Sequence, residues 1–130
     1  MVINMPGGGV QDIDESDFLW LRKAFDSEWK GATMLQLTDD RIYSNESVSD
    51  LSAKFDQAKV TLAGFSAPEA AKVKLVVSAA RVRQVVDADP IIYDDKAKSV
   101  LIFPGKLRLA VRDAPDDVRK ALGNAPATTS

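Results

Sequence analysis

Apolar side chains recur along this chain at helical spacing in some segments and in short strand-like runs in others. Between residues 14 and 29, Phe18, Leu21, Phe25 and Trp29 form one stripe with the period of an amphipathic helix. Acidic residues crowd the start of this segment, where the helix dipole favours negative charge. We therefore expect an amphipathic helix over residues 14–29.

Three further segments carry helix signals. Ser47 can cap a helix that continues to residue 62. Ser66-Ala-Pro68-Glu69 combines a capping box with a proline in the first turn, and it predicts a helix over 67–86. The β-branched residues of that segment leave a strand as the alternative. A short last helix opens at Asp113 and ends at Gly123.

Two groups of short apolar runs predict strands. A hairpin over 33–38 and 41–44 turns at Asp39-Asp40. A meander follows over 91–93, 100–103 and 106–112, and Pro104-Gly105 supplies its last turn because glycine tolerates a positive φ. The expected fold class is α+β. An antiparallel sheet, made of the hairpin plus the three-stranded meander, is packed by amphipathic helices in the order α-β-β-α-α-β-β-β-α.

This succession of elements resembles that of roadblock, longin and profilin-type modules. The resemblance covers the element order over most of the chain and includes no signature motif. It implies a non-enzymatic module that binds small GTPases, actin or its own copies.

The chain divides into three expected parts. Residues 1–11 form a flexible or docking arm, residues 12–123 a single α+β domain, and residues 124–130 a tail of small residues. Trp20 lies off the apolar stripe of the first predicted helix, so it is either an interface anchor or part of a wider buried face. The expected partner-binding residues are Val2, Ile3, Met5, Val10 and Trp20.

The 130 residues include no histidine and no cysteine. The chain therefore lacks a side chain that titrates near neutrality, a thiolate nucleophile and a sulfur ligand for metals. Aspartate pairs at residues 39–40, 94–95 and 116–117 could supply acid–base chemistry or hold Mg²⁺. All three occupy predicted turns or a helix start, where aspartate is favoured for local hydrogen bonding. We expect no catalytic residue, no metal and no cofactor.

Charge is unevenly distributed along the chain. Residues 1–50 carry a net charge of −6 and residues 51–130 a net charge of +4. Between residues 71 and 112, nine basic residues face four acidic ones, a balance that a nucleic-acid surface would show. The candidate residues for an anion or nucleic-acid surface are Lys72, Lys74, Arg81, Arg83, Lys106 and Arg108.

Three functions remain open at this point. The first is a non-catalytic protein–protein interaction or assembly module, for example a structural subunit of a virion or of secretion machinery, whose partner is a protein or its own copy. The alternative is a nucleic-acid-binding regulator that uses the basic surface of residues 71–112. The second alternative is a small carboxylate-based enzyme or ligand-binding protein. No secretory leader or membrane-length apolar run is evident, so we expect a cytoplasmic location, or incorporation in an assembled particle, and no membrane partner.

Overall fold

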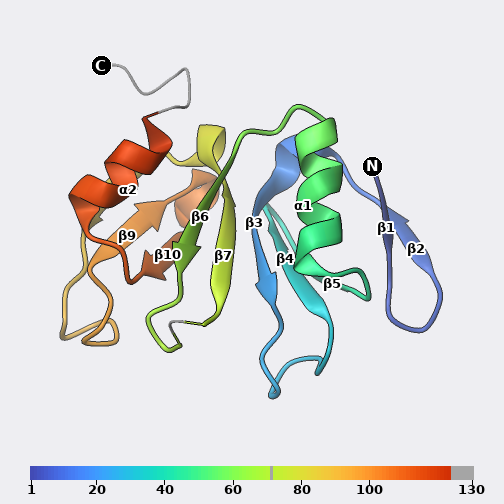
Figure 1. Ribbon diagram of the computed structural model, residues 1–130, viewed down its shortest axis with the longest axis horizontal. Coiled ribbons are helices and arrows are strands. Elements are labelled where there is room, and N and C mark those ends of the chain that lie inside the picture. The colour runs from blue at the N-terminus through green and yellow to red at the C-terminus, as the bar shows by residue number, and fades with distance from the viewer. Residues whose placement is uncertain (71, 124–130) are drawn as a thin grey trace.

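The computed structural model describes residues 1–70 and 72–123 (Figure 1). The N-terminal half contains β1 (Val2–Asn4), β2 (Val10–Asp12), β3 (Phe18–Lys23), β4 (Thr33–Leu37), β5 (Arg41–Ser44) and α1 (Val48–Gln57). The C-terminal half contains β6 (Leu62–Ser66), β7 (Lys74–Ser78), β8 (Gln84–Asp87), β9 (Ser99–Ile102), β10 (Arg108–Val111) and α2 (Pro115–Leu122). Three 3-10 turns, η1 (Glu15–Asp17), η2 (Ala79–Arg81) and η3 (Pro104–Lys106), connect them.

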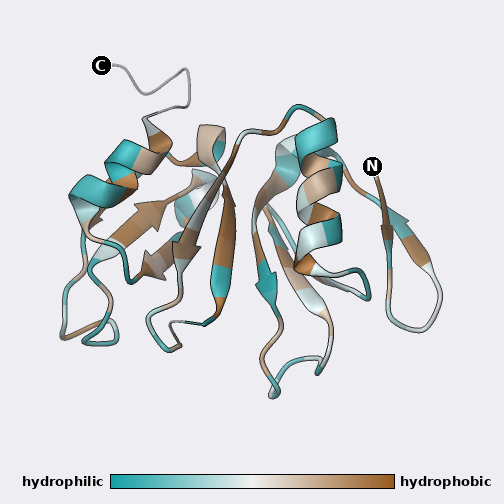
Figure 2. Cartoon of the chain, viewed as in Figure 1, coloured by the Kyte–Doolittle hydropathy of each residue, from teal (hydrophilic) through white to brown (hydrophobic). Residues whose placement is uncertain are grey.

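The strands form three sheets in which every pairing is antiparallel. The largest is five-stranded, in the order β5-β4-β3-β7-β6, and β3 is its central strand. A three-stranded sheet has the order β10-β9-β8, and β1 and β2 form a separate hairpin. Figure 2 shows strongly apolar stretches on β7 and β9. This is the pattern expected of strands that line a core.

The helix α1 covers one face of the five-stranded sheet. Leu51 and Phe55 of α1 are fully buried against Phe18 and Leu21 of β3. The rings of Phe18 and Phe55 stack with their centroids 3.9 Å apart. The helix begins where the sequence predicts, because the Ser47 side chain accepts a hydrogen bond from the backbone N–H of Asp50.

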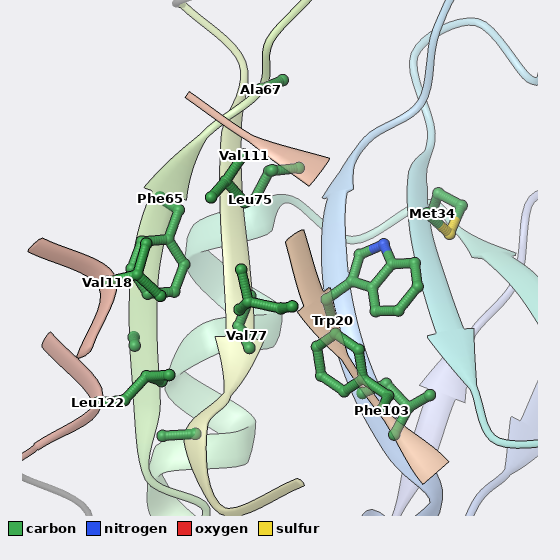
Figure 3. Close-up of a cluster of buried hydrophobic side chains, with 14 of the residues drawn as sticks. Trp20, Met34, Phe65, Ala67, Leu75, Val77, Phe103, Val111, Val118 and Leu122 are labelled. Carbon is green, nitrogen blue, oxygen red and sulfur yellow. The ribbon is translucent and has the colours of Figure 1, made fainter. Parts of the chain in front are cut away.

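The three-stranded sheet and α2 cover the opposite face. Trp20 of β3 packs against Phe103, with ring centroids 4.9 Å apart. Val118 and Leu122 of α2 close the same cluster beside Phe65 of β6 (Figure 3). The five-stranded sheet is thus buried on both faces, and its central strand has no solvent face except at its last residue.

The predicted helix over residues 14–29 is wrong, because this segment forms η1, β3 and the loop that follows. A bulge between Phe18 and Trp20 places Leu19 and Trp20 in one cluster, and Phe18 and Leu21 in the other. Residues three apart therefore point to the same face, as they would in a helix, although the backbone is extended. Burial on both faces also removes the polar alternation that identifies a strand.

The predicted helix over residues 67–86 is also wrong. This segment contains β7, η2 and most of β8, so the strand alternative is correct for residues 74–78 and 84–86. The helix-start signature at Ser66–Glu69 lies instead at the turn that leaves β6, where Ala67 N donates to Val73 O at 3.0 Å. Residues 91–93 are a turn and not a strand, and β8 takes their place in the meander.

Other local predictions are confirmed. The hairpin of β4 and β5, the strands β9 and β10 and the helix α2 all occur where the sequence indicates. The helix from Ser47 ends at Gln57, earlier than predicted, and Leu62 belongs to β6. The α+β class with antiparallel sheets is therefore correct, but the predicted element order is not. The resemblance to roadblock, longin and profilin-type modules rested on that order, so the structure does not support it.

Candidate nucleic-acid interface

Four of the predicted basic residues gather at one end of the three-stranded sheet. Arg83 N donates to Ile102 O at 2.7 Å, and Ile102 pairs across the sheet with Arg108. Lys106 lies in η3, the turn that joins β9 to β10, and Arg81 lies in η2 just before β8. We call Arg81, Arg83, Lys106 and Arg108 the basic end.

The turn chemistry of η3 sets the position of Lys106. Pro104 opens this turn, and Gly105 has a φ of 76°, as the sequence predicts for a tight turn. Lys106 itself has a φ of 65°, a conformation that few non-glycine residues adopt. Phe103 N donates to Leu107 O at 2.8 Å and closes the turn, so the lysine side chain stands exposed at its tip.

The basic end has positive charge that no acidic side chain neutralises. Within the part of the chain that the structure describes, none of its four residues forms an ion pair or a side-chain hydrogen bond. The sequence contains no acidic residue between positions 70 and 86 or between positions 96 and 112. Arg83, Lys106 and Arg108 are exposed, and Arg81 is half-buried. Unpaired cations of this kind attract phosphate groups.

Lys72 and Lys74 lie elsewhere. Lys74 begins β7 and Lys72 lies in the turn before it, whereas Arg81 follows the end of that strand. Five strand residues span roughly 13 Å at about 3.3 Å per residue, so the two lysines do not belong to the basic end. The role of Lys72 and Lys74 in a nucleic-acid surface remains a prediction.

A buried ion-pair network, which sequence analysis did not find, fixes the loop between β3 and β4. Glu28 accepts two hydrogen bonds from Arg22, at 2.7 and 3.2 Å, and one from Phe25 N at 2.9 Å. The Tyr43 hydroxyl donates to the same carboxylate at 3.1 Å, and Arg41 approaches it at 3.5 Å. The Arg22 guanidinium also lies 3.9 Å from the centroid of the Phe25 ring.

This network gives a pH prediction. The pKa of the Glu28 carboxyl is lowered from 4.5 to about 2, mainly by the hydrogen bonds from Arg22, with contributions from Phe25 N and Tyr43. Because the folded-state pKa is the lower one, this stabilisation is complete above pH 4.5 and is lost as the pH falls toward 2. The loss amounts to about 3 kcal/mol. Urea unfolding at several pH values should show a steeper acid decline for the native chain than for Glu28→Gln. Equal declines would contradict the prediction.

The predicted partner-binding residues occupy different environments. Ile3 is fully buried in the apolar cluster between α1 and the five-stranded sheet, whereas Val2 and Val10 are exposed. Met5 is half-buried. Trp20 is 4% exposed, so it belongs to the wider buried face. The partner-binding role and the division into arm, domain and tail remain predictions. The tail, residues 124–130, lies outside the described residues.

The aspartate pairs serve local structure. Asp40 Oδ1 accepts from Arg41 N and Asp94 Oδ1 from Lys96 N, at 2.8 and 2.9 Å. The hydrogen bond from Lys96 N is the main reason why the pKa of Asp94 is lowered. Asp116 pairs with Arg119 within α2. Across residues 1–70 and 72–123, no group of three acidic side chains is arranged to hold a metal ion.

Comparison with known proteins identifies a similar fold. No family model matches the chain, and no curated protein matches its sequence. A solved structure from Bacillus cereus, described as the LytTr DNA-binding domain of a methyl-accepting/DNA response regulator, superposes with a TM-score of 0.57. The match covers 95% of each chain at 12% sequence identity. The two chains therefore share a fold over nearly their whole lengths.

This likeness overturns the first functional hypothesis. The interpretation of the chain as an assembly module or structural subunit is wrong, because the fold match is to a domain described as DNA-binding. It favours the nucleic-acid alternative, which rested on the basic residues between 71 and 112. No helix among the described residues is both long and apolar enough to span a membrane.

Proposed function

We propose that this chain binds double-stranded DNA, without catalysing a reaction on it, through the basic end of its three-stranded sheet. The single observation that supports this most strongly is the whole-length fold match to a domain described as DNA-binding. The basic end adds chemical support, since it offers four cations free of acidic partners. The proposal includes a regulatory role for the chain and its location in the cytoplasm.

The geometry suits contact with the phosphate backbone. Arg83 immediately precedes β8 and Arg108 begins β10, so both lie at one end of the three-stranded sheet with β9 between them. Lys106 stands at the tip of the turn that joins β9 to β10. Arginine can donate two parallel hydrogen bonds to a phosphate, and lysine contributes a point charge. Because these contacts recognise phosphates and not base edges, the basic end accounts for affinity and orientation.

The predicted salt dependence tests the proposal. Four phosphate contacts give a slope of about −3.6 for log affinity against log salt concentration. Affinity for a fluorescein-labelled duplex should therefore fall on the order of 100-fold between 50 and 200 mM salt. The measurement is fluorescence anisotropy. Absence of binding at the lower salt concentration would overturn the proposal.

Matched variants locate the surface. Arg83→Gln/Arg108→Gln should reduce the salt slope by about 2, because two phosphate contacts are lost. The control Lys96→Gln/Lys120→Gln removes the same charge from exposed residues outside the basic end. If both double variants weaken binding equally, net charge and not the basic end is responsible.

A further inference from the structure

A pocket of about 220 Å³ lies between the five-stranded sheet and β10. Trp20, Arg22 and Phe25 line it from β3 and the following loop, Arg41 from β5, and Arg108 from β10. Segments far apart in the sequence therefore bring three guanidinium groups and two aromatic rings around one small space. Ligand sites combine apolar walls with a few polar groups in this way.

The donors of this pocket are not all used by the fold. The indole N–H of Trp20 donates to no acceptor within the described residues, although the side chain is 4% exposed. Figure 3 shows the indole nitrogen on the side of the ring turned away from Phe103. Arg108 likewise has no partner in the described part of the chain. Neither the Trp20 nitrogen nor the Arg108 guanidinium is among the buried unsatisfied atoms of the described residues, so both remain open to an incoming acceptor.

The charge balance defines the ligand. Arg22 and Arg41 share the Glu28 carboxylate, and Arg108 has no ion pair. The one acidic residue that lines the pocket is the exposed Glu69. The pocket therefore has an excess of one positive charge. Its remaining walls are apolar and include Pro68, Leu75 and Leu109. These features fit a small organic anion with a single negative charge. Its charged group would accept hydrogen bonds, and the rest of the molecule would be apolar.

We propose that this pocket binds a small organic carboxylate, held by the Trp20 indole N–H and by the guanidinium groups of Arg108 and Arg41. The inference rests on the pocket and not on DNA binding. Arg108 lines the pocket and also belongs to the basic end, so a carboxylate there competes for a side chain that the proposed DNA contact uses.

Tryptophan fluorescence tests the pocket directly, with benzoate as the probe. In the variant Trp29→Phe, which replaces an exposed side chain, emission reports on Trp20. Benzoate at constant ionic strength should change this emission saturably, with a Kd on the order of 1 mM. Arg108→Gln in the same background should raise that Kd about tenfold or more, whereas Arg83→Gln should leave it unchanged. The indole N–H resonance of Trp20 should shift along with the emission.

The remaining outcomes separate this proposal from the previous one. A linear, non-saturating change, or one that is equal in Arg108→Gln, overturns the carboxylate site. If a DNA duplex changes the Trp20 emission saturably and benzoate does not, the carboxylate site is also overturned. The pocket's affinity for anions is then assigned to DNA phosphate. Benzoate binding by a chain that binds no duplex supports the pocket and removes the proposed DNA-binding function. Circular dichroism of each variant verifies that the fold is retained.

Discussion

Replacement of Glu28 by alanine is expected to destabilise the chain by about 3–5 kcal/mol, measured as the free energy of unfolding in urea. The reason is that Arg22, whose side chain is 9% exposed, would keep its buried charge without a carboxylate partner. Phe25 N and the Tyr43 hydroxyl would lose the same acceptor. The β3–β4 loop, residues 24–32, would then lose the contacts that Glu28 makes with Arg22 of β3 and Tyr43 of β5.

Two control variants distinguish a buried charge from a lost contact. Tyr43→Phe removes one hydrogen bond to Glu28 and leaves the Arg22 pair intact, so a cost of only about 1–2 kcal/mol is expected. Arg22→Met/Glu28→Leu removes both charges and should recover much of the stability lost in Glu28→Ala. If the double variant is less stable than Glu28→Ala, the unpaired charge is not the cause of the destabilisation.

The second large effect concerns the contact between α1 and the sheet. Phe55→Ala is expected to lower the free energy of unfolding by about 3–5 kcal/mol, because it deletes a fully buried ring that stacks on Phe18. Chemical denaturation again provides the measurement. The DNA affinity of the folded variant should be unchanged, since Phe55 packs on the face of the five-stranded sheet opposite the one that the three-stranded sheet covers.

A conservative variant serves as the control for this prediction. Phe55→Leu keeps most of the buried apolar volume, so it should cost much less than Phe55→Ala. Equal losses would show that ring stacking, and not filled volume, dominates this contact. A loss below about 1 kcal/mol for Phe55→Ala would contradict the tight packing of α1 on β3.

The sequence predicts the charge of the candidate site, whose binding role remains a prediction, but not the arrangement of its residues. The nine basic residues between 71 and 112 indicate a positive surface, and that indication needs only composition. The sequence did not show that Arg83 and Arg108 lie at the same end of one sheet while Lys72 and Lys74 lie apart, since this depends on strand pairing. The Arg22–Glu28 pair also escaped notice, because a helix over 14–29 gives these residues other neighbours.

The sequence by itself determined the elements whose signals are local. Ser47 caps α1, Asp39-Asp40 turns the β4–β5 hairpin, Gly105 permits the turn of η3, and Pro115 opens α2. Each of these effects acts between residues a few positions apart, so it can be recognised within one short stretch of the sequence.

Only the tertiary structure decided the identity of β3 and β7. The five-stranded sheet is covered on both faces, so its inner strands show continuous apolar runs in place of alternation. The bulge at Leu19 gives β3 the spacing of a helix, and it can be recognised only against its partner β4. The pocket and the basic end follow from the same pairings, because their residues come from strands that are distant in sequence.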